Sequence, residues 1–173
     1  MNLRQRHYTI FVTVVLALQV LLLNHLTIST LFAPMVYVAI LIVMPLDTSP
    51  IKMLLTALLL GCFADLTMGT LGLNVLATLP LAMLRRTILL NVTNLSDYVF
   101  ANDVPTIKLL GPHRFYIYSA TMVVIHCLIF FFAEQLSLFN FWHFFQRLFV
   151  STLSSVAMVM ILLRLFNTRF EEK

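Results

Sequence analysis

The sequence predicts an all-α integral membrane protein, a bundle of six membrane-spanning helices in a single domain. Of its 173 residues, 61% are hydrophobic and only 10% are charged, whereas about a quarter of the residues are charged in soluble domains. Residues 7–46 contain no Asp, Glu, Lys or Arg, and because one crossing takes roughly 20 apolar residues, that stretch has room for two spans. The expected spans are residues 8–23, 31–46, 51–68, 71–84, 115–133 and 144–163.

Proline, glycine and polar residues set the boundaries of the first three spans. The first ends at a short polar break, residues 24–30. Pro34 falls in the first turn expected for the second span, where a missing N–H is tolerated, and Pro45 falls near its end. The third span begins beside Pro50 and ends at Gly69, a residue suited to a left-handed helix cap.

The second half of the chain holds one long polar segment. The fourth span is short, carries Pro80, and is expected to end at Arg85. Residues 85–114 are then expected to form a cytoplasmic loop with room for an interfacial helix. A short connection, residues 134–143, separates the fifth span from the sixth.

The positions of the basic residues predict the orientation. If the N-terminus is cytoplasmic, only Arg147 of the 11 Lys and Arg residues lies on the outer side. Such a bias is typical of a multi-pass protein with both termini in the cytoplasm. The basic residues are scattered among hydrophobic runs instead of lining one face, so we expect membrane lipids and no nucleic acid as partners.

One acidic residue stands out within the hydrophobic sequence. Asp65 is the only charged residue between Lys52 and Arg85. Ala57, Gly61, Asp65 and Gly69 recur at every fourth residue, so a helix places them on one narrow face of small side chains. In a membrane such a face packs closely on another helix, and a buried acid points into the protein. Gly69 and Gly72 predict a tight hairpin after it.

Asp65 should have polar neighbours at a similar depth. The candidates are Gln19 on the first span, Asn74 on the fourth, His126 on the fifth, and Gln146 or Arg147 on the sixth. A hydrogen-bonded cluster of some of these groups would make the acid tolerable. If hydrogen bonding is its role, Asp65→Asn should keep the packing.

Few residues suggest chemistry. No phosphate-binding loop, nucleophile elbow or zinc-protease pattern is present, so no catalytic, cofactor or metal residue is assigned. His126 and Glu134 share a helical face, which permits a proton relay or metal half-site, but ordinary packing and an interfacial carboxylate are the favoured interpretation. Ser151, Ser154 and Ser155 form a weakly polar patch, interpreted as an internal contact with the third helix in preference to an external interface.

The chain resembles the MreD family of bacterial rod shape-determining membrane proteins. The residues that carry the resemblance are Gly61, Asp65-Leu66 and the run Gly69-Thr70-Leu71-Gly72. Gln19 near the end of the first span, Phe32-Ala33-Pro34 and Phe132-Ala133-Glu134 also agree. The chain departs from the family at Met35, where many members have a polar residue.

The resemblance implies a non-enzymatic, multi-pass subunit of the cell-elongation machinery in the bacterial inner membrane. Its partners would be MreC, a RodA-type glycan polymerase with its class B penicillin-binding protein, and the MreB filament below the membrane. The family is similar in fold to the substrate-binding (S) subunits of vitamin transporters. A small-molecule binding subunit of a transporter is therefore the alternative function.

Overall fold

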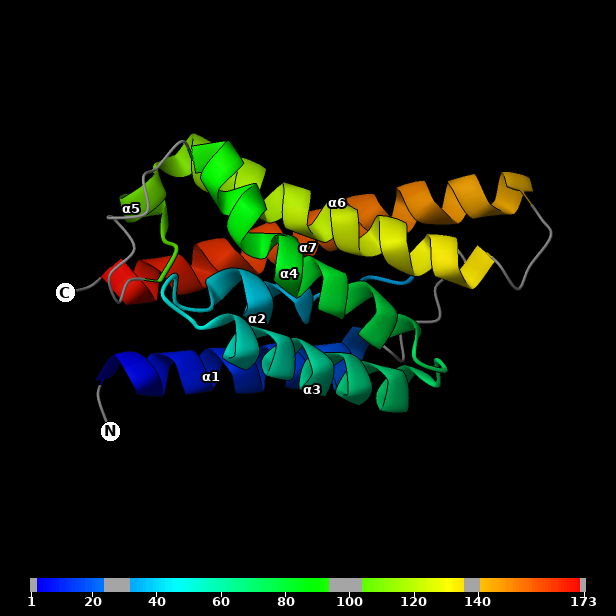
Figure 1. Cartoon of the computed structure of the whole chain (residues 1–173), viewed down its shortest axis with the longest axis horizontal. Coiled ribbons are helices and arrows are strands. Elements are labelled where there is room, and N and C mark those ends of the chain that lie inside the picture. The colour runs from blue at the N-terminus through cyan, green and yellow to red at the C-terminus, as the bar shows by residue number, and fades with distance from the viewer. Residues whose placement is uncertain (1–2, 24–31, 94–103, 136–140, 172–173) are drawn as a thin grey trace.

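The protein is a bundle of helices whose long members run roughly along one axis (Figure 1). The structure, a computed structural model, describes residues 3–23, 32–93, 104–135 and 141–171. Every regular element in those ranges is helical. The elements are α1 (Leu3–Leu18) with a π-helical turn (Gln19–Leu23), α2 (Val38–Val43), α3 (Pro50–Met68), α4 (Leu73–Thr93), α5 (Ile107–Leu110), α6 (Pro112–Gln135) and α7 (Phe141–Glu171).

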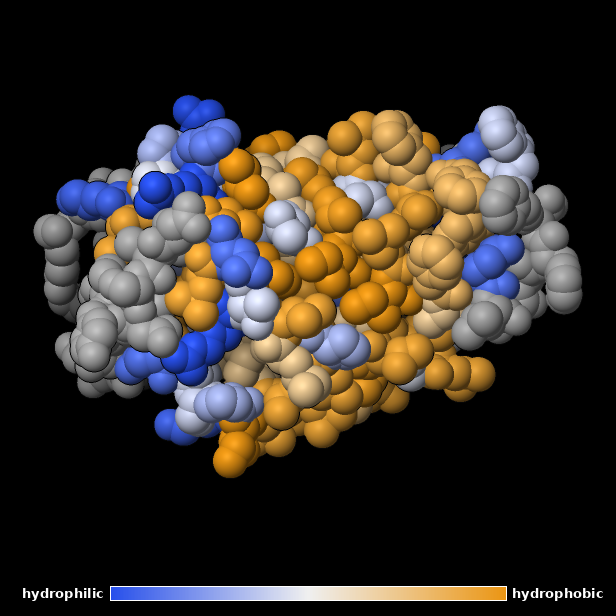
Figure 2. Space-filling view, turned by 45° about the horizontal axis from the view of Figure 1, so that its top comes forward, coloured by the Kyte–Doolittle hydropathy of each residue, from blue (hydrophilic) through white to orange (hydrophobic). Residues whose placement is uncertain are grey.

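Four of the described helices are long and apolar enough to cross a membrane. They are Pro50–Met68, Leu73–Val92, Pro112–Gln135 and Trp142–Asn167, and a shorter apolar helix covers His7–Leu21. On the face seen in Figure 2, hydrophobic residues cover the middle of the molecule and hydrophilic residues gather toward its two ends. These features confirm the all-helical class over the described residues and agree with a membrane protein. The count of six spans and the orientation of the termini stay predictions.

The helices alternate in direction along the bundle axis. α1 begins and α7 ends at the same end of the molecule, where α3 and α6 also begin (Figure 1). The α3–α4 hairpin lies at the opposite end. α3 packs on α4, α4 on α6, and α6 on α7, while α2 contacts most of the long helices. The long helices thus surround α2, all of whose residues are buried.

The prediction of a continuous second helix over residues 31–46 is wrong. In its described part, residues 32–36 form no helix, and α2 has only six residues. Proline explains both limits, because the residue before a proline is pushed out of helical geometry. Ala33 precedes Pro34, and Met44, which ends α2 with a ψ of 144°, precedes Pro45. Pro34 therefore lies before the helix and not in its first turn.

The fourth helix is longer than predicted. α4 continues past Arg85 and Arg86 to Thr93 despite Pro80 in its interior, so the loop expected over residues 85–114 begins as helix. At the other end of that segment α5 forms one short turn, and α6 already begins at Pro112. Residues 94–103 of the predicted loop, the break at 24–30 and residues 136–140 of the connection at 134–143 lie outside the described residues.

The remaining helices follow the sequence closely. α3 begins at Pro50 and ends at Gly69, which has the left-handed conformation (φ 69°) expected of a glycine cap, with its N–H bonded to the carbonyl of Asp65. α6 and α7 contain the predicted fifth and sixth spans. The third, fifth and sixth helices are therefore confirmed.

Candidate functional site

The small face of α3 packs directly against α4. A Cβ atom built on Gly61 would lie 2.6 Å from Thr78 Oγ1 and 2.7 Å from the Cα of Val75. Ala57, one turn earlier, is fully buried, and its carbonyl accepts a hydrogen bond from Thr78 Oγ1 (3.0 Å). The prediction that this face lets another backbone approach is confirmed, and the partner is α4.

Asp65 is the N-terminal cap of α4. Gly72 precedes that helix and has no side chain to offer, and the Asp65 carboxylate arrives from α3 in its place. Oδ1 accepts from the backbone N–H of Asn74 (3.0 Å), and Oδ2 accepts from that of Val75 (3.1 Å). Both N–H groups belong to the first turn, which has no intrahelical acceptors and carries the positive end of the helix dipole.

Two side chains complete the surroundings of the half-buried Asp65. Thr70 Oγ1 and Asn74 Nδ2 donate to Oδ1 at 2.6 Å and 3.1 Å. Asn74 Nδ2 also lies 2.7 Å from Thr70 Oγ1. The acid therefore closes the α3–α4 hairpin with hydrogen bonds to both of its oxygens.

The polar contacts continue into the centre of the bundle through Tyr37. The Tyr37 hydroxyl lies 2.6 Å from Asn74 Oδ1 and 2.8 Å from His126 Nε2. Tyr37, Asn74 and His126 are all buried, and they belong to the turn before α2, to α4 and to α6. The predicted cluster around Asp65 thus includes Asn74 directly and His126 through Tyr37.

A second set of polar groups holds the extended segment before α2. Gln19, in the π-helical turn, donates from Nε2 to the carbonyl of Pro34 (3.2 Å) and accepts from the N–H of Val36 (2.8 Å). On α7, Ser151 accepts from the N–H of Ala33 (3.1 Å) and Ser155 from that of Met35 (2.9 Å). Side chains of two flanking helices thus replace the backbone hydrogen bonds that an unwound segment lacks.

This arrangement gives Gln19 a defined role and corrects one prediction. Gln19 binds the extended segment through the carbonyl of Pro34 and the N–H of Val36. The serine patch is an internal contact, as expected, but Ser151 and Ser155 face the extended segment and not the third helix.

The C-terminal end of α2 is capped by a buried guanidinium. Arg85 donates to the carbonyls of Ile42 (3.4 Å), Met44 and Pro45 (3.4 Å). Its Nε donates to the hydroxyl of Tyr118 (3.0 Å). The positive charge therefore lies where the terminal carbonyls of α2 need donors.

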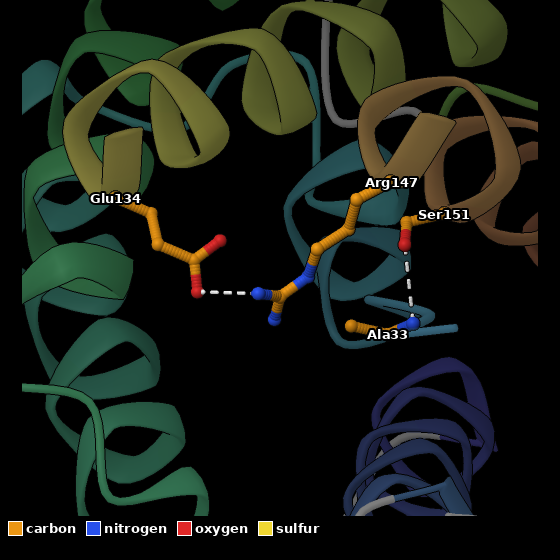
Figure 3. A network of polar contacts seen from close by, with 4 residues as sticks. All are labelled: Ala33, Glu134, Arg147 and Ser151. Atoms are coloured by element: carbon orange, nitrogen blue, oxygen red, sulfur yellow. Dashed lines mark hydrogen bonds and ion pairs between the residues drawn. The ribbon is translucent and has the colours of Figure 1, made fainter. Parts of the chain in front are cut away.

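Glu134 is paired with Arg147, one of the residues expected at the outer side. Figure 3 shows the two side chains pointing toward each other from α6 and α7, 3.1 Å apart, with Ser151 and Ala33 beside them. The Arg147 guanidinium also lies over the ring of Phe131 (5.7 Å). No group of three His, Cys, Asp or Glu able to hold a metal occurs in the described ranges, and Glu134 pairs with Arg147.

The site contains residues that the sequence analysis did not select. Tyr37 and Arg85 were missed: Tyr37 lies inside the predicted span 31–46, and Arg85 lies at the predicted end of the fourth span. Thr78, which bonds Ala57, was missed as well. Its position one helical turn after Asn74 on the same helix was the available signal.

Comparison with known proteins adds no further assignment, because no family model, no curated protein and no solved structure matches the chain.

Proposed function

We propose that the protein is a non-enzymatic scaffold of the MreD type in the bacterial inner membrane, which binds MreC and couples cell-wall synthesis to cell shape. In this proposal the chain crosses the membrane six times, with both termini in the cytoplasm. The basic helix ends then face anionic lipid on the cytoplasmic side. The RodA-type polymerase, its class B penicillin-binding protein and the MreB filament complete the assembly.

The proposal rests on the structural role of Asp65. A transported proton or ion needs an acid that is free to exchange its partner, whereas both oxygens of Asp65 accept hydrogen bonds that close the α3–α4 hairpin. Asp65 therefore stabilises the packing of α3 against α4. This favours a protein that works by presenting rigid helix surfaces within the bilayer.

Two helices offer such surfaces. α3 exposes Ile51, Leu59 and Leu66, and α7 exposes Phe149 and Leu153. In a bilayer these side chains contact either lipid or the span of a partner such as MreC.

The broken second span supports the alternative function. Substrate sites of many transporters lie at discontinuous helices near the membrane midplane, and here an extended segment followed by the short α2 lies inside the bundle. A small-molecule binding subunit would use this region. The hydrogen bonds from Gln19, Ser151 and Ser155 to the extended segment weigh against this alternative, because the backbone groups that they bind are no longer available to a ligand.

Purification of the tagged protein from its native membranes, with mass spectrometry of the co-purifying proteins and small molecules, tests the proposal. We expect MreC and the wall synthases with the wild type, less of them with Asp65→Ala, and wild-type recovery with Asp47→Ala, which removes an exposed acid. Recovery of a transporter's energy-coupling module, or of a retained vitamin-like molecule, would replace the scaffold by the alternative.

A further inference from the structure

The hydrogen bonds that link Asp65 to His126 form a continuous series, and the donor and the acceptor of each bond can be assigned. Four residues take part: Asp65 on α3, Asn74 on α4, Tyr37 before α2, and His126 on α6. Each contact joins two side chains that belong to different elements. Because each polar group has a fixed set of donors and acceptors, the state of one end constrains the other.

The carboxylate sets the orientation of the Asn74 amide. Asp65 accepts from two backbone N–H groups and from Thr70, so both of its oxygens act as acceptors. The atom of the Asn74 side chain that faces it, 3.1 Å away, must then be the NH₂ group. The amide oxygen is left to face Tyr37.

The orientation of Asn74 in turn fixes the hydroxyl of Tyr37. Two oxygens 2.6 Å apart need a proton between them, and the Asn74 oxygen carries none, so Tyr37 donates. A phenol has a single proton. Its oxygen must therefore accept from His126 Nε2, 2.8 Å away.

We propose that Asp65, through Asn74 and Tyr37, positions His126 in the tautomer that carries its proton on Nε2. Nδ1 is then a bare acceptor inside the bundle. The His126 side chain is fully buried, and Nδ1 has no hydrogen-bond partner among the described residues. An acceptor at this position takes a hydroxyl, an N–H group or a proton, and it repels a carboxylate or a phosphate.

The backbone of Ala77 also interacts with the imidazole. A proton on Nδ1 would give the opposite tautomer. In that case Tyr37 would have to donate to Nε2, and its oxygen would face the Asn74 oxygen at 2.6 Å with no proton between them. The series of hydrogen bonds that begins at Asp65 therefore excludes the tautomer with its proton on Nδ1.

Nitrogen magnetic resonance of the full chain in lipid nanodiscs, with histidine labelled with nitrogen-15, distinguishes the two tautomers, because protonated and bare ring nitrogens have well separated shifts. His126→Gln assigns the signal by its loss. At neutral pH we expect a protonated Nε2 and a bare Nδ1 in the wild type. A protonated Nδ1, or equal populations of the two tautomers, would overturn the proposal.

Three variants test how the tautomer is fixed. Asn74→Leu removes the acceptor from Tyr37, so Tyr37 should donate to Nε2 and the proton should move to Nδ1. Tyr37→Phe removes the link and should give a mixture of tautomers. Tyr116→Phe deletes the hydroxyl of another tyrosine on α6, one that takes no part in this series of hydrogen bonds, and should leave the spectrum unchanged. An unchanged His126 signal in a folded Tyr37→Phe or Asn74→Leu protein would also contradict the proposal.

Discussion

At the scale of single residues, two side chains on α3 explain how the chain tolerates a charged residue in an apolar helix. Gly61 has no side chain, which lets α4 approach, and Asp65 then bonds the first turn of that helix. The two roles depend on each other, because the carboxylate reaches the N–H groups of Asn74 and Val75 only when the helices are in close contact.

Asp65→Asn should therefore fold but be less stable. Both carboxylate oxygens accept hydrogen bonds, whereas an amide has one acceptor and one NH₂ group, so some donor must face another donor. An unsatisfied group costs about 1–3 kcal/mol, and the free energy of unfolding in mixed micelles should fall by about that amount. Asp47→Asn, at an exposed acid, should change it by less than about 0.5 kcal/mol. Equal stability of the two variants would mean that Asp65 does not cap α4.

Gly61→Ala should separate α3 from α4. The added Cβ would lie 2.7 Å from the Cα of Val75, and since this is a backbone atom, a helix must move. Overpacking of this kind costs about 1–3 kcal/mol, and Gly61→Leu should be worse. Thermal unfolding in detergent measures the loss, with Cys62→Leu as the control because Cys62 is the exposed next residue on the same helix. A larger loss for Cys62→Leu than for Gly61→Ala would contradict the packing described.

At the scale of elements, the unwound segment and α2 are held by side chains of their neighbours. Gln19, Ser151 and Ser155 bind the segment, and Arg85 binds the carbonyl end of α2. The prolines at positions 34 and 45 explain why α2 is short, but nothing local to residues 32–46 specifies the side chains that replace its missing hydrogen bonds. Those side chains come from the π-helical turn after α1, from α4 and from α7, outside this stretch of sequence.

Removal of the side chains that bind residues 33–36 should loosen this extended segment without unfolding the bundle. In Gln19→Leu the N–H of Val36 loses its acceptor, and in Ser155→Ala the N–H of Met35 does. We expect faster hydrogen exchange at these two amides, by about 10-fold for each 1.4 kcal/mol of lost protection. Ser154→Ala is the matched control, since that hydroxyl donates to the carbonyl of Ser151, within its own helix. Unchanged exchange in both Gln19→Leu and Ser155→Ala would exclude this role.

Substitution of Arg85 should lower the stability of the protein more than substitution of Arg86. Arg85→Leu leaves the carbonyls of Ile42, Met44 and Pro45 without their donor, so the free energy of unfolding should fall by several times the roughly 1 kcal/mol of one hydrogen bond. Arg86→Leu changes an exposed residue and should cost less. The comparison uses the same unfolding assay in micelles, and a reversed order would show that Arg85 does not cap α2.

At the scale of the whole molecule, composition and periodicity predicted the helical membrane character, three of the long helices and the small face of α3. These features depend on local patterns, such as apolar length, a proline at a helix start and a glycine at a helix end. The length of α4 was missed because a charged residue, Arg85, marks the predicted end of the apolar span, whereas the fold buries it against α2. Tyr37 was missed because its polar role depends on Asn74 and His126 from other helices.

The function proposed for this bundle is that of a scaffold for cell elongation. The most direct test is cell shape after depletion of the protein from its native cells, with complementation by wild type, Gly61→Leu or Cys62→Leu at matched membrane abundance. We expect rounded cells on depletion, and rod shape restored by wild type and Cys62→Leu but not by Gly61→Leu. Cells that keep their shape and width without the protein would contradict the claim.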